Sequence, residues 1–565
     1  MEQQRIIECV PNFSEGRDKE KIQAIVNAIE SVEGITMLDV DPGEATNRTV
    51  VTFVGMPEAV VEAAFRGVKK AAEVIDMSQH HGAHPRIGAT DVLPLVPVAG
   101  VTLEECAEMA RQLGRRIAEE LRIPVYCYEA AAFTPERKNL AVCRKGEYEA
   151  LAARADATGE APDFGARPFA DEMARSGATV VGARDFLIAV NYNLNTTSTR
   201  RANAIAFDVR EKGRPKRTGP LVTDKPEIGP DGKPVMIPGT LKGTKAIGWY
   251  IPEYGIAQVS MNITDINATP LHAAFDEVSR AAAARGVRVT GAEIVGLVPR
   301  RTLIEAGKHY LRLQQRSAGI PDDEIIRTAI ISMGLSELKP FDVNEKIIEN
   351  RISKPDTDAL TAMTCRRFAY ETASESPAPG GGSISAYMGA LGAALATMVA
   401  NLSAHKPGWD ARWEEFSEVA EKGQKLTDRL LALVDEDTAA FNRVMDAFKL
   451  PKGTPEEKAA RTEAIQQATF YAAEVPLHTM EAASEAFPLL MQMARTGNPA
   501  SASDAGVGAL AARSAILGAE LNVRINAASL TDRSQADKLI EKAKKLAAEA
   551  CAAEKEILAE VESKL

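Results

Sequence analysis

The chain has only six cysteines among its 565 residues, and no two of them share the Cys-x-x-Cys spacing. A zinc ribbon or a dithiol redox site is therefore not expected, and sparse cysteine is typical of a reducing compartment. An excess of basic residues is also absent. The net charge of −11 argues against a general nucleic-acid binder, although it leaves room for a local basic pocket that binds an anion.

Signals for export and membrane insertion are equally scarce. The polar residues 1–5 are not followed by a long apolar run, so we expect no signal peptide and predict a cytoplasmic protein. Only Ile384–Leu402 resembles a membrane span, and Gly and Ala dominate it. Because such residues give weak transfer into lipid, we expect a buried, closely packed helix and no membrane span.

What is present is an ordinary globular composition, with 45% hydrophobic and 26% charged residues in a chain too long for one core. The order strand-helix-strand-strand-helix-strand occurs twice before about residue 298, which predicts two ferredoxin-like α+β lobes with a crevice for a ligand. Beyond the linker, strand signals almost vanish, which predicts an all-α helical domain. The predicted boundaries are 1–186, 187–352, a linker at 353–360, and 361–565.

Helix starts are marked by local chemistry. Thr102 with Glu105, and Thr454 with Glu457, have the spacing of capping boxes. Pro476 should interrupt or end the helix that begins after Thr454. The Pro-, Gly- and Lys-rich insertion Lys212–Pro238 reads either as a surface loop or as a lid over an anionic ligand.

Three of the seven histidines, His80, His81 and His84, lie within eight residues. Gly and Pro in the same stretch favour a loop, where reacting groups are commonly mounted. Acid/base catalysis by one imidazole is the favoured interpretation, because histidine titrates near neutrality. Metal binding lacks a completing ligand cluster, and a purely structural histidine is the other alternative. Nearby Arg86 and Asp91 are candidates for anion binding and for holding an imidazole.

Asp39 and Asp41 end a strand on one face, before a turn. They suit either substrate contact or turn formation. Gly380, Gly381, Gly382 and Ser383 open the apolar helix. The free backbone N–H groups there suit an anion, but glycines also allow close helix packing. No Lys-Ser or Lys-Thr follows, so a nucleotide-binding P-loop is excluded.

Asp435 and Asp437 lie in a helical stretch and point about 200° apart, so only one of them can face inward. Asp437 precedes Phe441 by one turn, and we expect Phe441 in the core, which makes Asp437 the inner carboxylate. The residues alone favour a solvated acidic patch over a proton-transfer group with a raised pKa.

Several motifs resemble a known family. The first part resembles glutamate formiminotransferases in Cys9–Gly16, Asp39–Thr49, His84–Ala89, Ala161–Gly165 and Gly248–Tyr250. The last part is similar to formiminotetrahydrofolate cyclodeaminases in Ala378–Ser383, Val434–Phe441 and Thr454–Glu457. Their order is that of the bifunctional formiminotransferase-cyclodeaminase family.

The resemblance implies two steps of histidine degradation. A formimino group passes from N-formimino-L-glutamate to tetrahydrofolate, and 5-formiminotetrahydrofolate then cyclises to 5,10-methenyltetrahydrofolate with loss of ammonia. It also implies a polyglutamylated folate as carrier, no metal or nucleotide, and a homo-oligomer built as a ring of dimers.

The resemblance further assigns residues. His84 corresponds to the transferase base and Asp437 to the cyclodeaminase acid/base group, with Asp41, Arg48 and Arg86 in support. Folate contacts fall on a longer set: Gly165, Ala166, Arg167, Gly177, Gly239, Thr240, Leu241, Gly380, Gly381, Gly382 and Ser383. Two alternatives stay open: a formyl transferase joined to a methenyltetrahydrofolate cyclohydrolase, and a non-catalytic folate-binding scaffold.

Overall fold

The computed structural model describes residues 5–43, 47–81, 85–155, 160–165, 171–219, 224–352 and 359–565. The chain divides into two compact units. The first comprises residues 1–302 and 333–354, and the second 303–332 and 355–565. The first contains mixed β-sheets and the second is built from helices.

The first unit begins with a seven-stranded sheet in which β3 pairs with β4, followed by the order β1-β4-β2-β5-β7-β6. Its strands are β1 (Ile6–Cys9), β2 (Asn12–Phe13), β3 (Ile35–Gly43), β4 (Arg48–Gly55), β5 (Thr90–Ala99), β6 (Val125–Glu129) and β7 (Thr179–Ala183). The pairs β5–β7 and β7–β6 are parallel, and the others are antiparallel.

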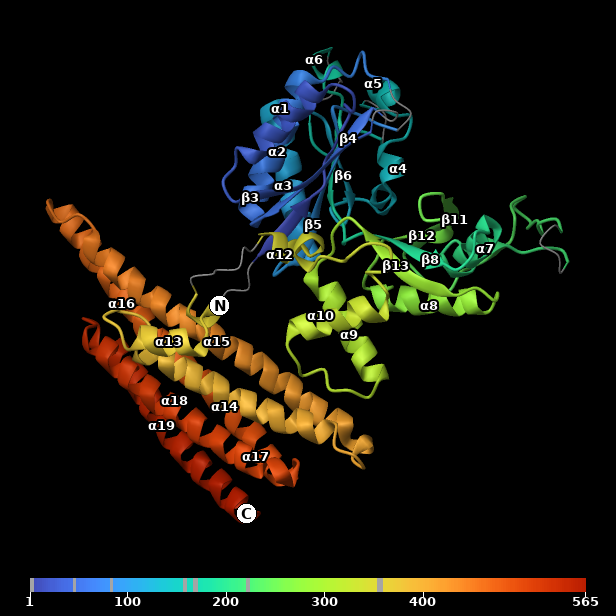
Figure 1. Cartoon of the computed structure of the whole chain (residues 1–565). Coiled ribbons are helices and arrows are strands. Elements are labelled where there is room, and N and C mark those ends of the chain that lie inside the picture. Colours follow the sequence, from blue (N-terminus) through green and yellow to red (C-terminus); the bar gives the residue numbers. More distant parts are fainter. Residues whose placement is uncertain are drawn as a thin grey trace. The chain divides into compact units, whose positions relative to one another are not determined.

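Three helices, α1 (Lys19–Glu30), α2 (Pro57–Val74) and α3 (Leu103–Leu121), share one hydrophobic core with this sheet (Figure 1). The predicted capping box at Thr102 and Glu105 forms at the start of α3. The short helices α4 (Leu140–Cys143), α5 (Leu151–Ala155) and α6 (Asp171–Ala174) belong to the connections before β7.

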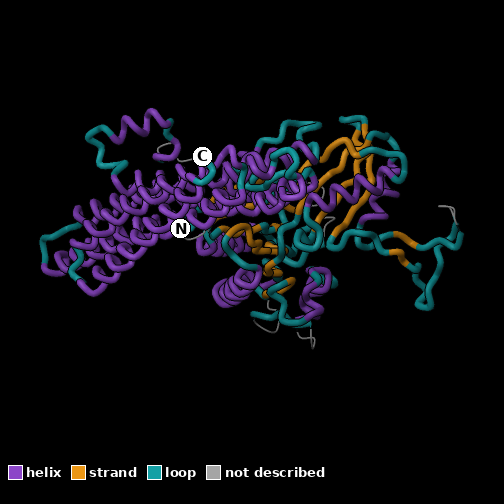
Figure 2. Tube along the Cα trace, turned by 90° about the horizontal axis from the view of Figure 1, so that it is seen from below, coloured by secondary structure: helices purple, strands orange, loops and turns teal. Residues whose placement is uncertain are grey.

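A second sheet has the order β11-β12-β8-β13 and is antiparallel throughout. Its elements are β8 (Ile188–Leu194), α7 (Thr199–Val209), β11 (Thr244–Ile251), β12 (Ile256–Ile263), α8 (Leu271–Ala283) and β13 (Val289–Val295). The insertion 212–238 is an arm beyond α7, held by the strand pair β9 (Arg214–Pro215) and β10 (Met236–Ile237) (Figures 1 and 2). The short helices α11 (Val343–Lys346) and α12 (Ile348–Ile352) complete the unit.

The second unit is a bundle of long helices that run side by side (Figures 1 and 2). They are α14 (Gly381–Ala404), α15 (Trp413–Lys449), α16 (Pro455–Ser484), α17 (Ala486–Thr496), α18 (Ala502–Ala528) and α19 (Arg533–Glu562), with the shorter α13 (Cys365–Thr372). The helices α9 (Arg300–Leu313) and α10 (Asp322–Ser332) precede them in the chain.

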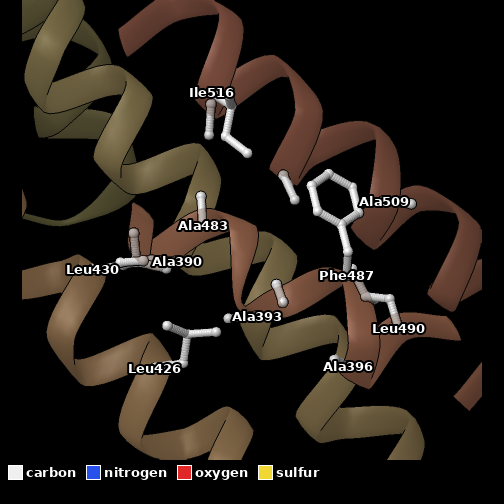
Figure 3. Packing of buried hydrophobic residues seen from close by; sticks show 14 of the residues in the cluster. Ala390, Ala393, Ala396, Leu426, Leu430, Ala483, Phe487, Leu490, Ala509 and Ile516 are labelled. Carbon is white, nitrogen blue, oxygen red and sulfur yellow. The ribbon is translucent and has the colours of Figure 1, made fainter. Parts of the chain in front are cut away.

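Small residues of α14 let neighbouring helices approach closely. Ala390, Ala393 and Ala396 are fully buried, and they lie among side chains of α15, α17 and α18 (Figure 3). By length and composition α14 could cross a membrane, with a hydropathy of 1.5, but 61% of the tested window is buried inside the protein. Burial on that scale is typical of the core helix of a bundle.

The prediction that Pro476 interrupts or ends its helix is wrong, because α16 continues through it to Ser484. A proline has no N–H to donate to the carbonyl four residues earlier, which here is Ala472. The side-chain amide of Asn526 donates to that carbonyl at 2.7 Å. A side chain from α18 therefore replaces the missing helical hydrogen bond.

Candidate functional site

One asparagine holds the histidine loop in place. Asn47 has a positive φ of 49°, a conformation that asparagine tolerates better than most residues. Its Oδ1 accepts from Gly16 N at 3.0 Å, and its Nδ2 donates to His81 O at 3.0 Å. The carbonyl of Asn47 lies 2.9 Å from Nε2 of His80. Asn47 thus holds the histidine loop at two points and is itself fixed by Gly16.

This geometry gives His80 a structural role. A carbonyl can only accept, so Nε2 of His80 carries the proton and donates it. Burial lowers the pKa of His80, which favours the neutral form of the ring, and the hydrogen bond to Asn47 opposes that change. His81 lines the adjacent cavity instead. Residues 82–84 lie outside the described residues, so the structure does not place His84.

Arg86 is already engaged by carboxylates. Its guanidinium forms a two-point contact with Glu149, at 2.7 and 2.9 Å, and a third bond to Glu147 at 3.0 Å. It also donates to His80 O at 3.3 Å. Hydrogen bonding from Arg86 lowers the pKa of Glu149. Arg86 therefore stabilises the histidine loop through its bond to His80 O and also lines the cavity.

Asp91, a candidate for holding an imidazole, binds Arg144 instead. It is buried and also accepts from Ile87 N at 3.0 Å. Burial raises the pKa of Asp91, and Arg144 opposes that change. For the nearby Arg48, a cationic group, burial has the opposite effect and lowers the pKa, and the charge of Asp91 opposes that change.

A cavity of about 880 Å³ opens beside the histidine loop, within the first unit. It is lined by His81, Pro85, Arg86, Asn139, Leu140, Ala141, Arg144, Lys145, Gly146, Glu147, Glu149 and Lys245. Most of the lining comes from the histidine loop and from residues 139–149, and the second sheet contributes Lys245 of β11. Four of these side chains, Arg86, Arg144, Lys145 and Lys245, are cationic, against the two carboxylates of Glu147 and Glu149. Arg86, Arg144 and Lys145 pair with carboxylates, but the lining itself has an excess of positive charge, which suits an anionic substrate.

The other predicted transferase residues have mostly structural surroundings. Asp41 is exposed on β3, paired with Val50. Gly165 and Gly177 both have positive φ, and a Cβ on Gly177 would lie 2.4 Å from Ile87 O. Gly177 therefore allows close packing behind the histidine loop. Ala166 and Arg167 lie outside the described residues.

The segment Gly239–Leu241 packs against the end of α7. A Cβ on Gly239 would lie 2.0 Å from Arg210 O. Thr240 N donates to Asp208 O at 3.1 Å, and Leu241 N donates to Val209 O at 2.8 Å. These contacts anchor the return of the arm to the body of the unit.

The second unit has its own candidate site around Asp437. Ser383 Oγ donates to Asp437 Oδ2 at 2.8 Å, and Ser383 is fully buried. The Ser383 backbone N–H also bonds this carboxylate, so the anion at the N-terminus of α14 is the protein's own Asp437. Burial raises the pKa of Asp437, and the bonds from Ser383 oppose that change.

The two acidic residues diverge as predicted. Asp435 accepts from Leu360 N at 2.7 Å and from Thr361 Oγ1 at 2.6 Å, so it caps the turn at 360–362. Asp437 faces a cavity of about 380 Å³. The expectation that Phe441 lies in the core is wrong: it is 39% exposed and lines this cavity beside Asp437.

The cavity combines the glycines of α14 with residues of α15, α16 and α18. Its lining comprises Pro377, Ala378, Gly380, Gly381, Gly382, Asp437, Thr438, Phe441, Val444, Phe448, Ile465, Gln466, Thr469, Ala472, Asn522, Asn526 and Ser529. Aromatic walls with a few polar groups suit a flat, polar ring system. Sequence analysis missed Asn522 and Asn526, which carry no local signal.

Among the residues that the structure describes, no group of three or more His, Cys, Asp or Glu side chains is placed to hold a metal ion. The first site combines a histidine-bearing loop with a cavity rich in basic side chains, and the second combines a half-buried carboxyl group with a cavity partly lined by aromatic side chains.

Comparison with known proteins matches both parts of the chain to one family. Three family models match along the chain: "Formiminotransferase domain, N-terminal subdomain" at 6–184, "Formiminotransferase domain" at 189–353, and "Formiminotransferase-cyclodeaminase" at 364–545.

The chain is 42% identical to the formimidoyltransferase-cyclodeaminase of Mus musculus, over 94% of this chain and 93% of that protein. It is 41% identical to a glutamate formimidoyltransferase of Thermoplasma acidophilum, over 54% of this chain and 93% of that one. It is also 40% identical to a methenyltetrahydrofolate cyclohydrolase of Methylorubrum extorquens, over 36% of this chain and 97% of that protein. The chain belongs to the formiminotransferase-cyclodeaminase family.

Proposed function

We propose that the chain catalyses two consecutive folate reactions of histidine degradation. The first moves the formimino group of N-formimino-L-glutamate to N5 of tetrahydrofolate and releases glutamate. The second cyclises 5-formiminotetrahydrofolate to 5,10-methenyltetrahydrofolate and releases ammonia. One observation carries the proposal: this member of the family has two separate cavities, each with a side chain able to transfer protons in its lining. These side chains are His81 in the first cavity and Asp437 in the second.

The first reaction needs a base in the cavity of the first unit. Attack of N5 on the formimino carbon leaves a positively charged nitrogen that must lose its proton before glutamate departs. We assign this role to His84, which comes three residues after His81 in the sequence, and it is His81 that lines the cavity. A neutral imidazole within hydrogen-bond reach accelerates such a step by roughly 10²–10⁴-fold.

The second reaction needs a group that both accepts and donates a proton. N10 loses a proton as it attacks the formimino carbon, and the departing nitrogen must gain one to leave as ammonia. Asp437 suits both roles because burial raises its pKa toward neutrality. Its position among Gly382, Phe441 and Asn522 leaves the carboxyl group facing the cavity.

The two active sites are tested by removing each acid/base group separately. His84→Ala should abolish glutamate release and leave cyclisation of supplied 5-formiminotetrahydrofolate intact. Asp437→Asn should do the reverse, as followed by methenyltetrahydrofolate absorbance and ammonia release. Loss of both activities in either folded variant would refute the two-site proposal.

A cyclohydrolase is the second candidate for the helical unit. It is favoured by the 40% identity to the Methylorubrum extorquens protein, which is matched over 97% of its length. A cyclohydrolase would hydrolyse methenyltetrahydrofolate to 10-formyltetrahydrofolate and would release no ammonia. Ammonia formed in step with methenyltetrahydrofolate decides for the cyclodeaminase.

The finer architecture belongs to the same proposal. We infer that each lobe of the first unit is ferredoxin-like, which the order β11-β12-β8-β13 with α7 and α8 supports for the second lobe. The matches at 6–184, 189–353 and 364–545 support the proposed boundaries at 186, 352 and 361. The division into compact units differs from these boundaries in one respect, because it groups residues 303–332 with the helical bundle and not with the second lobe.

The assembly and the location complete the proposal. We infer a cytoplasmic homo-oligomer, built as a ring of dimers, that uses polyglutamylated folate. Light scattering after size-exclusion chromatography of the full-length protein tests the oligomeric state. A KM that falls as glutamates are added to tetrahydrofolate tests the preference for a polyglutamate tail. A monomeric mass, or a KM independent of tail length, would refute the corresponding part.

A further inference from the structure

A third cavity, of about 720 Å³, lies between α7 and the arm. It is lined by Thr199, Arg200, Arg201, Asn203, Ala204, Phe207, Arg214, Pro215, Lys216, Arg217, Gly219, Ile237 and Arg285. None of these residues lines the cavity beside the histidine loop or the one beside Asp437.

The floor and walls come from different segments. Arg200, Asn203, Ala204 and Phe207 follow the i, i+3, i+4, i+7 spacing and so form one face of α7. Arg214–Arg217 and Ile237 of the arm form the facing wall, and Arg285 closes one side. The side chain of Asn203 fixes the floor, because it exchanges hydrogen bonds with Gly248 at 2.9 and 3.1 Å.

The lining carries more positive charge than the neighbouring carboxylates neutralise. Its six basic residues are Arg200, Arg201, Arg214, Lys216, Arg217 and Arg285, and no Asp or Glu belongs to the lining. Asp208 pairs with both Arg214 and Arg285, and Glu227 pairs with Lys216 at 2.8 Å.

The remaining arginines keep their charge available. Arg217 donates to a neutral backbone carbonyl, that of Asp224, at 3.0 Å. Neither Arg200 nor Arg201 forms a recorded ion pair with any of the residues described by the structure. In a chain with a net charge of −11, this local excess of positive charge is a binding feature rather than a reflection of composition.

We propose that this cavity binds a small organic anion with two or more carboxylate or phosphate groups. Planar guanidinium groups bind such groups through two parallel hydrogen bonds. The aromatic face of Phe207 and the side chain of Ile237 provide apolar contacts for a short carbon skeleton between the charged groups. The arm and α7 together set the spacing of the charges. The site is separate from both reactions proposed above, so its failure would leave them untouched.

Isothermal titration of the full-length protein with citrate and with inorganic pyrophosphate tests the site and separates the two anion sources. Saturable binding of either probe, weakened as NaCl is raised, is expected. In Arg200→Ala/Arg201→Ala the Kd should rise at least tenfold. Tighter binding of citrate identifies carboxylates on carbon as the ligand class, and tighter binding of pyrophosphate identifies phosphates.

The matched control removes two charges from the same arm but outside the lining. Lys225→Ala/Lys233→Ala has the same net charge as the test variant, and its Kd should equal that of the wild type. Arg200→Lys/Arg201→Lys keeps the charge, and its Kd should lie between those of the wild type and the Arg200→Ala/Arg201→Ala variant. Lysine lacks the planar guanidinium group that makes two parallel hydrogen bonds to one anion. Equal loss in both alanine pairs, or no saturable binding of either probe, would overturn the proposal.

Discussion

Ser383 Oγ donates to Asp437 Oδ2 at 2.8 Å, which ties the first turn of α14 to the middle of α15. Ser383 is fully buried, so this hydroxyl contacts the carboxylate rather than the ligand space of the cavity. The predicted folate contact at Ser383 is thus better described as a positioning contact. Its effect is on the pKa of Asp437, which burial raises and this bond lowers.

Ser383→Ala should therefore raise the pKa of Asp437 further. A hydrogen bond to a charged group contributes about 1.5–3 kcal/mol, so losing it disfavours the ionised carboxylate. If the ionised carboxylate accepts the N10 proton, the acidic limb of the cyclisation rate should move to higher pH. The pH dependence of methenyltetrahydrofolate formation measures it.

A neighbouring serine provides the control for that experiment. Ser385 is also buried on α14, but its Oγ donates to Gly381 O at 2.7 Å. Ser385→Ala should leave the pH profile in place. Identical profiles for wild type and Ser383→Ala would show that the bond does not set the titration of Asp437.

Gly382 should tolerate no side chain, because a Cβ there would lie 2.0 Å from Asp437 Oδ1. Gly382→Ala should displace the carboxylate and reduce cyclisation at least a hundredfold, while transfer in the first unit continues. Gly506→Ala on α18 is the matched control, since it lies outside the cavity lining and its Cβ would come no closer than 3.4 Å, to Leu558 Cδ2. The ratio of the two kcat values, each with a near-normal far-UV spectrum, measures the effect.

Gly380–Gly382 also show why part of the site could be predicted and part could not. The sequence left open whether an anion or a close contact explains these glycines. Both apply, because the anion is the Asp437 carboxylate, which belongs to a helix more than fifty residues away. Spacing along the chain carries no signal for such a partner.

The fold divides in the same way. The capping boxes at Thr102 and Thr454 form as predicted, because both partners lie within one turn. Strand β7 was not predicted, since it enters between β5 and β6 through parallel pairing with distant residues. Pro476 stays helical only because Asn526, on another helix, replaces its missing donor.

Asn47 should control the transferase without touching its reacting atoms. Asn47→Gly preserves the positive φ but removes the side-chain bonds to Gly16 N and His81 O. We expect at least a tenfold lower kcat for transfer and unchanged cyclisation, because the histidine loop loses its anchor. Asn47→Asp, which keeps the acceptor and loses the donor, should fall between them. Transfer at the wild-type rate in Asn47→Gly would rule out this anchoring role.

Glu8 should make the first unit less stable as pH rises. It lies buried on β1, where burial raises its pKa from 4.5 to about 7 and Arg184 opposes that rise. The folded state therefore binds more protons than the unfolded state between these values, so stability falls as pH increases through this window, and the contribution from protonated Glu8 is gone above about 7. A shift of this size corresponds to roughly 3 kcal/mol.

Glu8→Gln removes the titrating group and should flatten that dependence, so that the variant gains stability relative to wild type at alkaline pH. The exposed Glu30→Gln on α1 is the control and should follow wild type at every pH. Urea unfolding of the full chain at several pH values between about 5 and about 8 measures both, because the free energy of unfolding changes with pH only where the two states bind protons unequally. A wild-type slope that persists in Glu8→Gln would assign the pH dependence to another group.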